Sequence, residues 1–279
     1  MRIPITMCHG IHEVGRYPLS VAHLDRLMAI AAELGFESIN YDQLDLWRRG
    51  EDELPARPFM FDVDHPERSV FTDVCEVLGR YGYKGNLFIN TGPMDELHAG
   101  PLPSDADRTT MTWDEARELM AHGWHMGAHT VTHPNLSDLH VEDPSGAKIS
   151  AELDQCNETL ERELGKPMRD FAFVGTSCSS SAEREVMKRY RFGRLWIRRE
   201  DTAQRQSSTD YEVDGRQICY GEYVGSDQPN DADGGPPISV RYITKESNPY
   251  RLPSMELQSS LAYEPEDFRR YFEEALNES

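Results

Sequence analysis

Short runs of β-forming residues alternate with segments of helical periodicity along most of this chain. The runs expected to form strands lie at 3–8, 59–64, 87–89, 171–174 and 195–197. The segments expected to form helices lie at 20–34, 69–80, 112–122, 149–164 and 180–190. Strands that alternate with helices predict a parallel sheet, because each parallel connection needs a long crossover. The pattern therefore indicates an open α/β sheet or a (β/α) barrel.

Several of the expected helices carry sequence signals at their ends. Ser20 precedes the first helix, and Gly165 follows the longest one. Thr112 and Glu115 have the spacing of a capping box, in which each side chain bonds the backbone N–H of the other residue. These residues place the helix boundaries independently of the apolar periodicity.

The alternation weakens after residue 198. Residues 200–237 are polar and rich in Asp, Gly, Ser and Pro, so we expect a long excursion or small β insertion there that shapes the pocket. Residues 91–110 are expected to form a long loop, 238–244 a late strand and 266–276 a terminal helix. We expect one domain over residues 1–279, interrupted at about 200–237.

The charge and apolar patterning exclude some classes of function. The formal net charge of −20 argues against a broad basic face for nucleic acid or an anionic membrane. No apolar run approaches the ~18 residues of a membrane span. The first ten residues lack the apolar core of a signal peptide, so we expect a cytoplasmic protein.

Two stretches carry residues suited to metal chemistry. In His129-Thr130-Val131-Thr132-His133-Pro134, two histidines stand four residues apart, and neutral imidazole is the commonest ligand for zinc. The stretch Phe59-Met60-Phe61-Asp62-Val63-Asp64-His65 is an apolar run that ends in acids. Barrel and open α/β enzymes place their chemistry at such carboxyl ends of strands. Two histidines and one carboxylate would leave a coordination position open for water.

Taken together, these motifs resemble the polysaccharide deacetylase (NodB-homology) family of metal-dependent amide hydrolases. The resemblance rests on the opening Pro4-Ile5-Thr6-Met7-Cys8-His9, the acidic strand end, Gly85-Asn86-Leu87-Phe88-Ile89, Gly127-Ala128-His129 through His133-Pro134, Leu164-Gly165-Lys166-Pro167 and Leu252-Pro253. It covers most of the chain and implies a distorted (β/α) barrel with fewer than eight repeats.

The acidic motif fits the family pattern in two registers. In members with Asp-x-Asp, the first aspartate is a general base and the second a metal ligand, which makes Asp62 the base and Asp64 the ligand beside His129 and His133. In members with two adjacent aspartates, Asp64 would be the base and His65 would replace the ligand, giving a three-histidine site. We favour the first register, because residues i and i+2 of a strand share one side and a carboxylate completes the usual ligand set.

The resemblance implies hydrolysis of an N-acyl group by water activated at one divalent ion. Zinc is the expected ion, and cobalt, nickel, manganese and iron are alternatives. The expected substrate is an N-acetylated or N-formylated amino sugar, soluble or carrier-linked, or a related amide. The rival hypothesis is a catalytically inactive carbohydrate-binding or assembly protein on the same barrel.

Two departures from the family pattern support that rival. Residues 173–177 lack the proline of the usual third motif, and no late Leu-x-His supplies a general acid. His9 and His12 are the alternative acids. Trp124 and Trp196 could stack on a sugar, although core packing is the commoner use of a tryptophan.

Overall fold

Seven parallel strands form a closed barrel. The computed structural model describes residues 1–15, 18–175, 180–197, 210–213, 216–219, 241–259 and 262–277. Within these residues the barrel consists of β1 (Ile5–Cys8), β3 (Pro58–Asp64), β4 (Asn86–Ile89), β5 (His125–Ala128), β6 (Asp170–Ala172), β7 (Phe192–Ile197) and β10 (Leu252–Glu256). The ring closes because β1 pairs in parallel with both β3 and β10. This confirms the predicted barrel with fewer than eight repeats.

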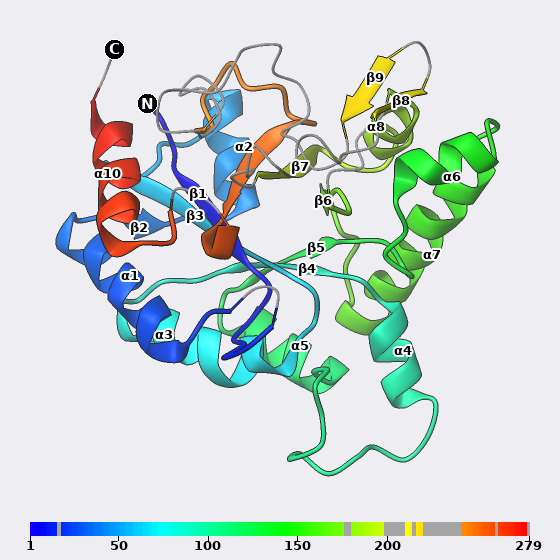
Figure 1. Ribbon diagram of the computed structural model, residues 1–279, viewed down its shortest axis with the longest axis horizontal. Helices are drawn as coiled ribbons and strands as arrows, with labels where there is room; N and C mark the ends of the chain where they lie inside the picture. Colours follow the sequence, from blue (N-terminus) through cyan, green and yellow to red (C-terminus); the bar gives the residue numbers. More distant parts are fainter. Residues whose placement is uncertain are drawn as a thin grey trace.

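Helices surround the barrel on its outside (Figure 1). They are α1 (Val21–Glu33), α2 (Tyr41–Arg49), a π-helical turn (Val70–Val74) that runs into α3 (Cys75–Arg80), α4 (Gly92–His98), α5 (Trp113–Ala121), α6 (Leu136–Glu142), α7 (Ala147–Leu164), α8 (Ser180–Met187) and α10 (Pro265–Leu276). A 3-10 turn (Leu257–Ser259) directly follows β10. The short strand β2 (Glu37–Ser38) extends the sheet beside β3. Among the described residues, none of these helices is both long and apolar enough to cross a membrane.

The structure confirms the predicted residues at the ends of three helices. Ser20 accepts a hydrogen bond from the His23 N–H at the start of α1. Thr112 and Glu115 form the expected capping box at the start of α5. Gly165 ends α7 with a φ of 74°, a conformation that favours glycine.

Three local elements have a specific physical explanation. The strand β2 ends at Ser38, because the Asn40 side chain caps α2. The loop predicted at 91–110 contains α4, whose first turn accommodates Pro93. The strand β10 was not predicted, since proline is rare within sheets. Pro253 is tolerated there because pairing of β10 with β1 begins only at Met255.

Alternation along the strands separates the barrel interior from the layer under the helices. A small apolar cluster draws on six barrel strands and includes Ile5, Met60 and Phe88. The intervening residues Phe59 and Phe61 belong to the larger core shared with the helices. Since strand residues two apart share a face, Asp62 and Asp64 continue the inward face begun by Met60.

Most of the predicted insertion lies outside the described residues. Its described part is an antiparallel hairpin of β8 (Asp210–Val213) and β9 (Arg216–Cys219). Of the late strand predicted at 238–244, residues 238–240 also lie outside the described part, and Ile243 makes an isolated bridge to Ile3.

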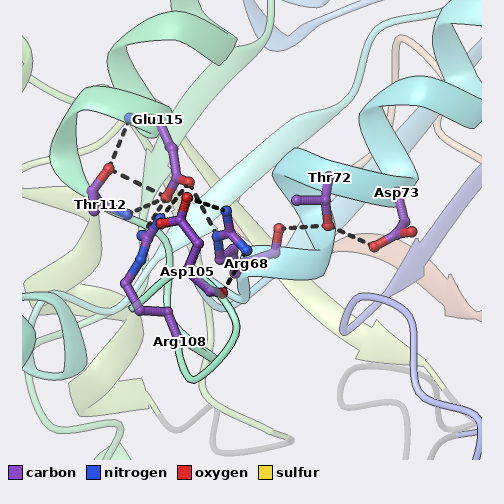
Figure 2. A network of polar contacts seen from close by, with 7 residues as sticks. All are labelled: Arg68, Thr72, Asp73, Asp105, Arg108, Thr112 and Glu115. Carbon is purple, nitrogen blue, oxygen red and sulfur yellow. Dashed lines mark hydrogen bonds and ion pairs between the residues drawn. The ribbon is translucent and has the colours of Figure 1, made fainter. Parts of the chain in front are cut away.

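A charged network ties the segment after α4 to the helix α5 (Figure 2). Both oxygens of Glu115 accept hydrogen bonds from Arg108, at 2.8 and 2.9 Å. Arg68 donates to the same carboxylate at 3.2 Å and to the carbonyl oxygen of Asp105 at 2.9 Å. Arg68 also follows His65 closely in sequence, so the network anchors the segment that leaves β3.

Candidate active site

Three histidines meet at the carboxyl ends of two neighbouring barrel strands. His65 follows β3, and His129 and His133 follow β5. One ring nitrogen from each residue can be chosen so that all three lie within 4.8 Å of one another. The ring centroids are 4.6 to 5.2 Å apart. The structure thus brings the predicted histidine pair together with the alternative ligand, His65.

Hydrogen bonds to the far side of two rings prepare the cluster for a metal ion. The His65 Nδ1–H donates to Asn90 Oδ1 at 3.0 Å, and the His129 Nδ1–H donates to the Ala172 carbonyl oxygen at 2.8 Å. Each ring therefore keeps the lone pair on Nε2. The Nε2 atom of His129 is buried and makes no hydrogen bond. A buried acceptor without a donor is costly, so this donor set fits a divalent ion.

The three rings are held in their neutral state. Burial, followed by the neighbouring His9, lowers the pKa of His65. Burial and the adjacent His65 lower the pKa of His133 to about 4. Burial also lowers the pKa of His129 well below its usual range. Neutral imidazole is the form that binds a metal, so the cluster needs no deprotonation at neutral pH.

Backbone strain is concentrated at this cluster. Among the described residues, the only non-glycine residues with positive φ are His65 (70°), Thr130 (71°) and His133 (60°). Each such conformation costs on the order of 1–3 kcal/mol, and it is rarest for a β-branched residue such as Thr130. The surrounding structure must therefore hold these loops in place.

Two aspartates occupy the barrel interior beside the cluster. Asp64 is paired with Arg194 of β7, and its carboxylate lies 3.9 Å from His129 Nε2. Asp62 accepts hydrogen bonds from the Tyr41 hydroxyl at 2.8 Å and from Asn86 Nδ2 at 3.0 Å. Arg194 Nε lies 3.2 Å from Asp62 Oδ2, so one arginine serves both carboxylates.

Burial acts on the two carboxylates in the same direction, but their neighbours differ. Burial would raise the pKa of Asp64, yet Arg194 and His129 hold that pKa well below its usual range. Burial raises the pKa of Asp62 to about 6, against the opposing effect of Arg194. Asp64 is therefore the carboxylate that is fully ionised beside the histidines at neutral pH.

A second acid–histidine pair borders the cluster. His9 Nδ1 lies 3.1 Å from Glu256 Oε1, and the Glu256 side chain is fully buried. The His9 ring stacks on the His65 ring at 5.5 Å, and Trp196 meets His9 edge-on at 5.9 Å. His12 contacts the site only indirectly, through an Nε2 atom 3.1 Å from the His9 carbonyl oxygen.

Comparison with known families identifies the chain. A family model for polysaccharide deacetylases matches residues 54–192, about half of the chain, and this range contains all three histidines and both aspartates. The chain belongs to the polysaccharide deacetylase family. Membership in this deacetylase family implies an acetylated carbohydrate as substrate. No curated protein sequence matches the chain.

Solved structures of deacetylases share the fold. The chain is 15% identical to BC0361, a polysaccharide deacetylase from Bacillus cereus, with a TM-score of 0.65 over 98% of this chain and 69% of that one. It is 14% identical to the BpsB deacetylase domain from Bordetella bronchiseptica, with a TM-score of 0.62 over 91% and 95%. It is 15% identical to the Streptococcus pyogenes deacetylase PplD, solved with acetate, with a TM-score of 0.60 over 70% and 83%.

Several residues of this deacetylase site were missed in the sequence. Arg194 had one available signal, which is a charged residue inside the apolar run of β7. Glu256 ends a strand that was not predicted, and Asn90 follows β4 without any distinguishing motif. Of the two tryptophans considered, Trp124 lies in the core, 3% exposed, and only Trp196 borders the histidines.

Proposed function

We propose that this protein is a metal-dependent hydrolase that removes an N-acetyl or N-formyl group from an amino sugar or a related amide. The observation that carries the proposal is the convergence of three histidine nitrogens with an ionised carboxylate at one end of a deacetylase barrel. The family supplies the reaction class, and the side chains supply the groups that such a reaction needs.

The ligand set that we propose is His65, His129 and His133. This is the second of the two registers, and it is favoured because Asp64 is committed to Arg194 while the three histidines share one cluster. Three neutral imidazoles suit zinc, with cobalt and nickel as close alternatives, better than they suit magnesium. When bound there, the ion supplies Lewis acidity that polarises a carbonyl and lowers the pKa of water.

Asp64 is the proposed general base. Its carboxylate is ionised and lies beside His129, so it can accept the proton of the attacking water. The ion pair with Arg194 fixes its orientation. Asp62, which the first register would make the base, is enclosed by Tyr41 and Asn86 and instead supports Arg194 from within the barrel.

His9 is the proposed general acid. Its stacking on His65 places it beside the ligand cluster, and its contact with the buried Glu256 carboxylate orients the ring. It would donate a proton to the departing amine. We further propose that Trp196, half-buried beside His9, provides an apolar face for the sugar ring.

The proposal is tested by assaying the zinc-loaded protein on a panel of N-acetylated and N-formylated amino-sugar oligomers. Acetate or formate release is measured, and the matched control is His129→Ala. We expect release by the wild-type protein and none by the control. Binding of these oligomers without release, with zinc, cobalt or nickel alike, would overturn the proposal in favour of a non-catalytic carbohydrate-binding protein.

A further inference from the structure

The loop that carries His133 has an unusual set of hydrogen bonds. It follows β5 and spans Thr130 to His133, with positive φ at both of these residues. Such a loop cannot form the repeating bonds of a helix or strand, so each backbone group needs a partner of another kind. Where those partners lie determines what holds His133 at the cluster.

The carbonyl groups of the loop are held by the chain segment that follows β4. The Thr130 carbonyl accepts from the Thr91 N–H at 3.1 Å, and the Val131 carbonyl accepts from the Gly92 N–H at 2.9 Å. A Cβ atom at Gly92 would lie 2.7 Å from the Val131 oxygen, so glycine permits this close approach. One side of the loop is thus fixed to backbone.

Two adjacent N–H groups of the loop are held by one side chain. Glu152 of α7 accepts from the Val131 N–H at 2.9 Å and from the Thr132 N–H at 3.0 Å, both at Oε2. Its Oε1 accepts from the Thr132 hydroxyl at 2.7 Å. The His133 N–H donates to the Thr130 hydroxyl at 3.1 Å. A carboxylate that accepts several bonds is a strong anchor.

We infer that Glu152 is a positioning residue that holds the strained loop and thereby keeps His133 at the metal site. The inference rests on the proposed function, because it assigns Glu152 to the support of one proposed ligand. The inference also goes beyond the proposed function, since Glu152 is not part of the histidine cluster and acts on it through the loop. Without this carboxylate, two adjacent N–H groups lose their common acceptor, and the positive-φ conformation loses its main anchor.

The experiment compares wild-type protein with Glu152→Ala, Glu152→Gln and Glu158→Ala. Glu158 lies on the same helix, is exposed and serves as the matched control. Two quantities are measured, namely zinc affinity by competition with a chromophoric chelator and amide hydrogen exchange at Val131 and Thr132. The exchange measurement does not require that zinc is bound.

Glu152→Ala should weaken zinc binding about 10- to 100-fold and accelerate exchange at both amides. Glu152→Gln should show a smaller loss, because an amide oxygen can still accept from both N–H groups. It also keeps the test available if the alanine variant fails to fold. Glu158→Ala should match the wild-type protein in both measurements.

Two outcomes would overturn the inference. The first is that Glu152→Ala has the same zinc affinity and the same amide exchange rates as Glu158→Ala. The other is a loss of zinc affinity with unchanged exchange at Val131 and Thr132. If neither the wild-type protein nor any variant binds zinc, accelerated exchange in Glu152→Ala alone still supports the anchor of the loop, while zinc as the ion of the proposed hydrolase is refuted separately.

Discussion

Arg194 and Asp64 form an ion pair inside the barrel, although 130 positions separate them in the sequence. Arg194 is fully buried, and its guanidinium also lies 5.0 Å above the Phe88 ring. The same guanidinium contacts Asp62, so a single cation balances two carboxylates. The arrangement makes Arg194 a structural requirement for keeping two acids beside the histidine cluster.

Replacing Arg194 by Met should destabilise the fold by about 3–5 kcal/mol, because it leaves two buried carboxylates without their cation. The free energy of unfolding in urea measures this. Adding Asp62→Asn to Arg194→Met removes one of the stranded charges and should recover part of the loss. If the free energy of unfolding of Arg194→Met is within about 1 kcal/mol of the wild-type value, the ion pair is not important for stability.

The two aspartates should respond differently to removal of their charge. Asp64→Asn should lower kcat by about 100-fold or more, because the group that accepts the proton is lost. Asp62→Asn should have a much smaller effect, since Asp62 acts through Arg194. Acetate release and zinc content are measured on both. Comparable losses in kcat, or a larger loss in Asp62→Asn, would restore Asp62 as the base.

Metal content distinguishes the two ligand registers. Elemental analysis of His65→Ala should show loss of zinc, because one of three donors in the cluster is gone. Asp64→Ala should retain zinc, since Asp64 is paired with Arg194 and lies outside that cluster. The reverse pattern would identify Asp64 as the third ligand, as the first register requires.

Local patterns predicted an α/β sheet or barrel and the histidine pair, because both are read from residues near one another in sequence, and the family resemblance then favoured the barrel. The two-residue period of a strand also predicted that Asp62 and Asp64 face the same side, and both contact Arg194. The choice of register depends instead on a positive φ at His65 and on an arginine from a distant strand. The charge of Arg194 inside an apolar run is visible in the sequence, but its pairing with Asp64 is not.

The proposed acid shows the same limitation. His9 follows the first strand and Glu256 ends the last one, so only closure of the barrel brings them together. The absence of a late Leu-x-His is consistent with a different strand supplying the acid. A sequence motif cannot show that another strand supplies the acid, because it does not record which strands become neighbours.

A general acid matters most when the leaving group is a poor one. His9→Ala should therefore slow hydrolysis of an N-acetyl sugar by about 100-fold or more, but slow an aryl ester far less, since a phenolate leaves without protonation. His12→Ala is the matched control and should retain most activity, because the His12 ring bonds the backbone of His9 rather than its imidazole. Equal losses on both substrates would indicate that His9 has a structural role.

Glu115 provides a pH-dependent contribution to stability away from the site. Burial would raise its pKa, but hydrogen bonds from Arg108, the Thr112 N–H and Arg68 lower that pKa to about 2. The value in the unfolded chain is about 4.3. Because the folded-state pKa is the lower one, the ionised network stabilises the fold above about pH 4.5, and this contribution is lost as the pH falls towards 2.

Glu115→Gln isolates this charge, because glutamine can still complete the capping box with Thr112. Since Asp105 and part of Arg68 in this network are exposed to solvent, we expect destabilisation of only about 1–2 kcal/mol at neutral pH. In urea unfolding, the difference in free energy of unfolding between Glu115→Gln and the wild-type protein should be constant down to about pH 5. It should become smaller below about pH 4.5. Glu118→Gln, at an exposed position of the same helix, should show no such dependence. A difference in free energy of unfolding that stays constant down to about pH 3 would mean that the ionised form of Glu115 is not stabilised by its arginine partners.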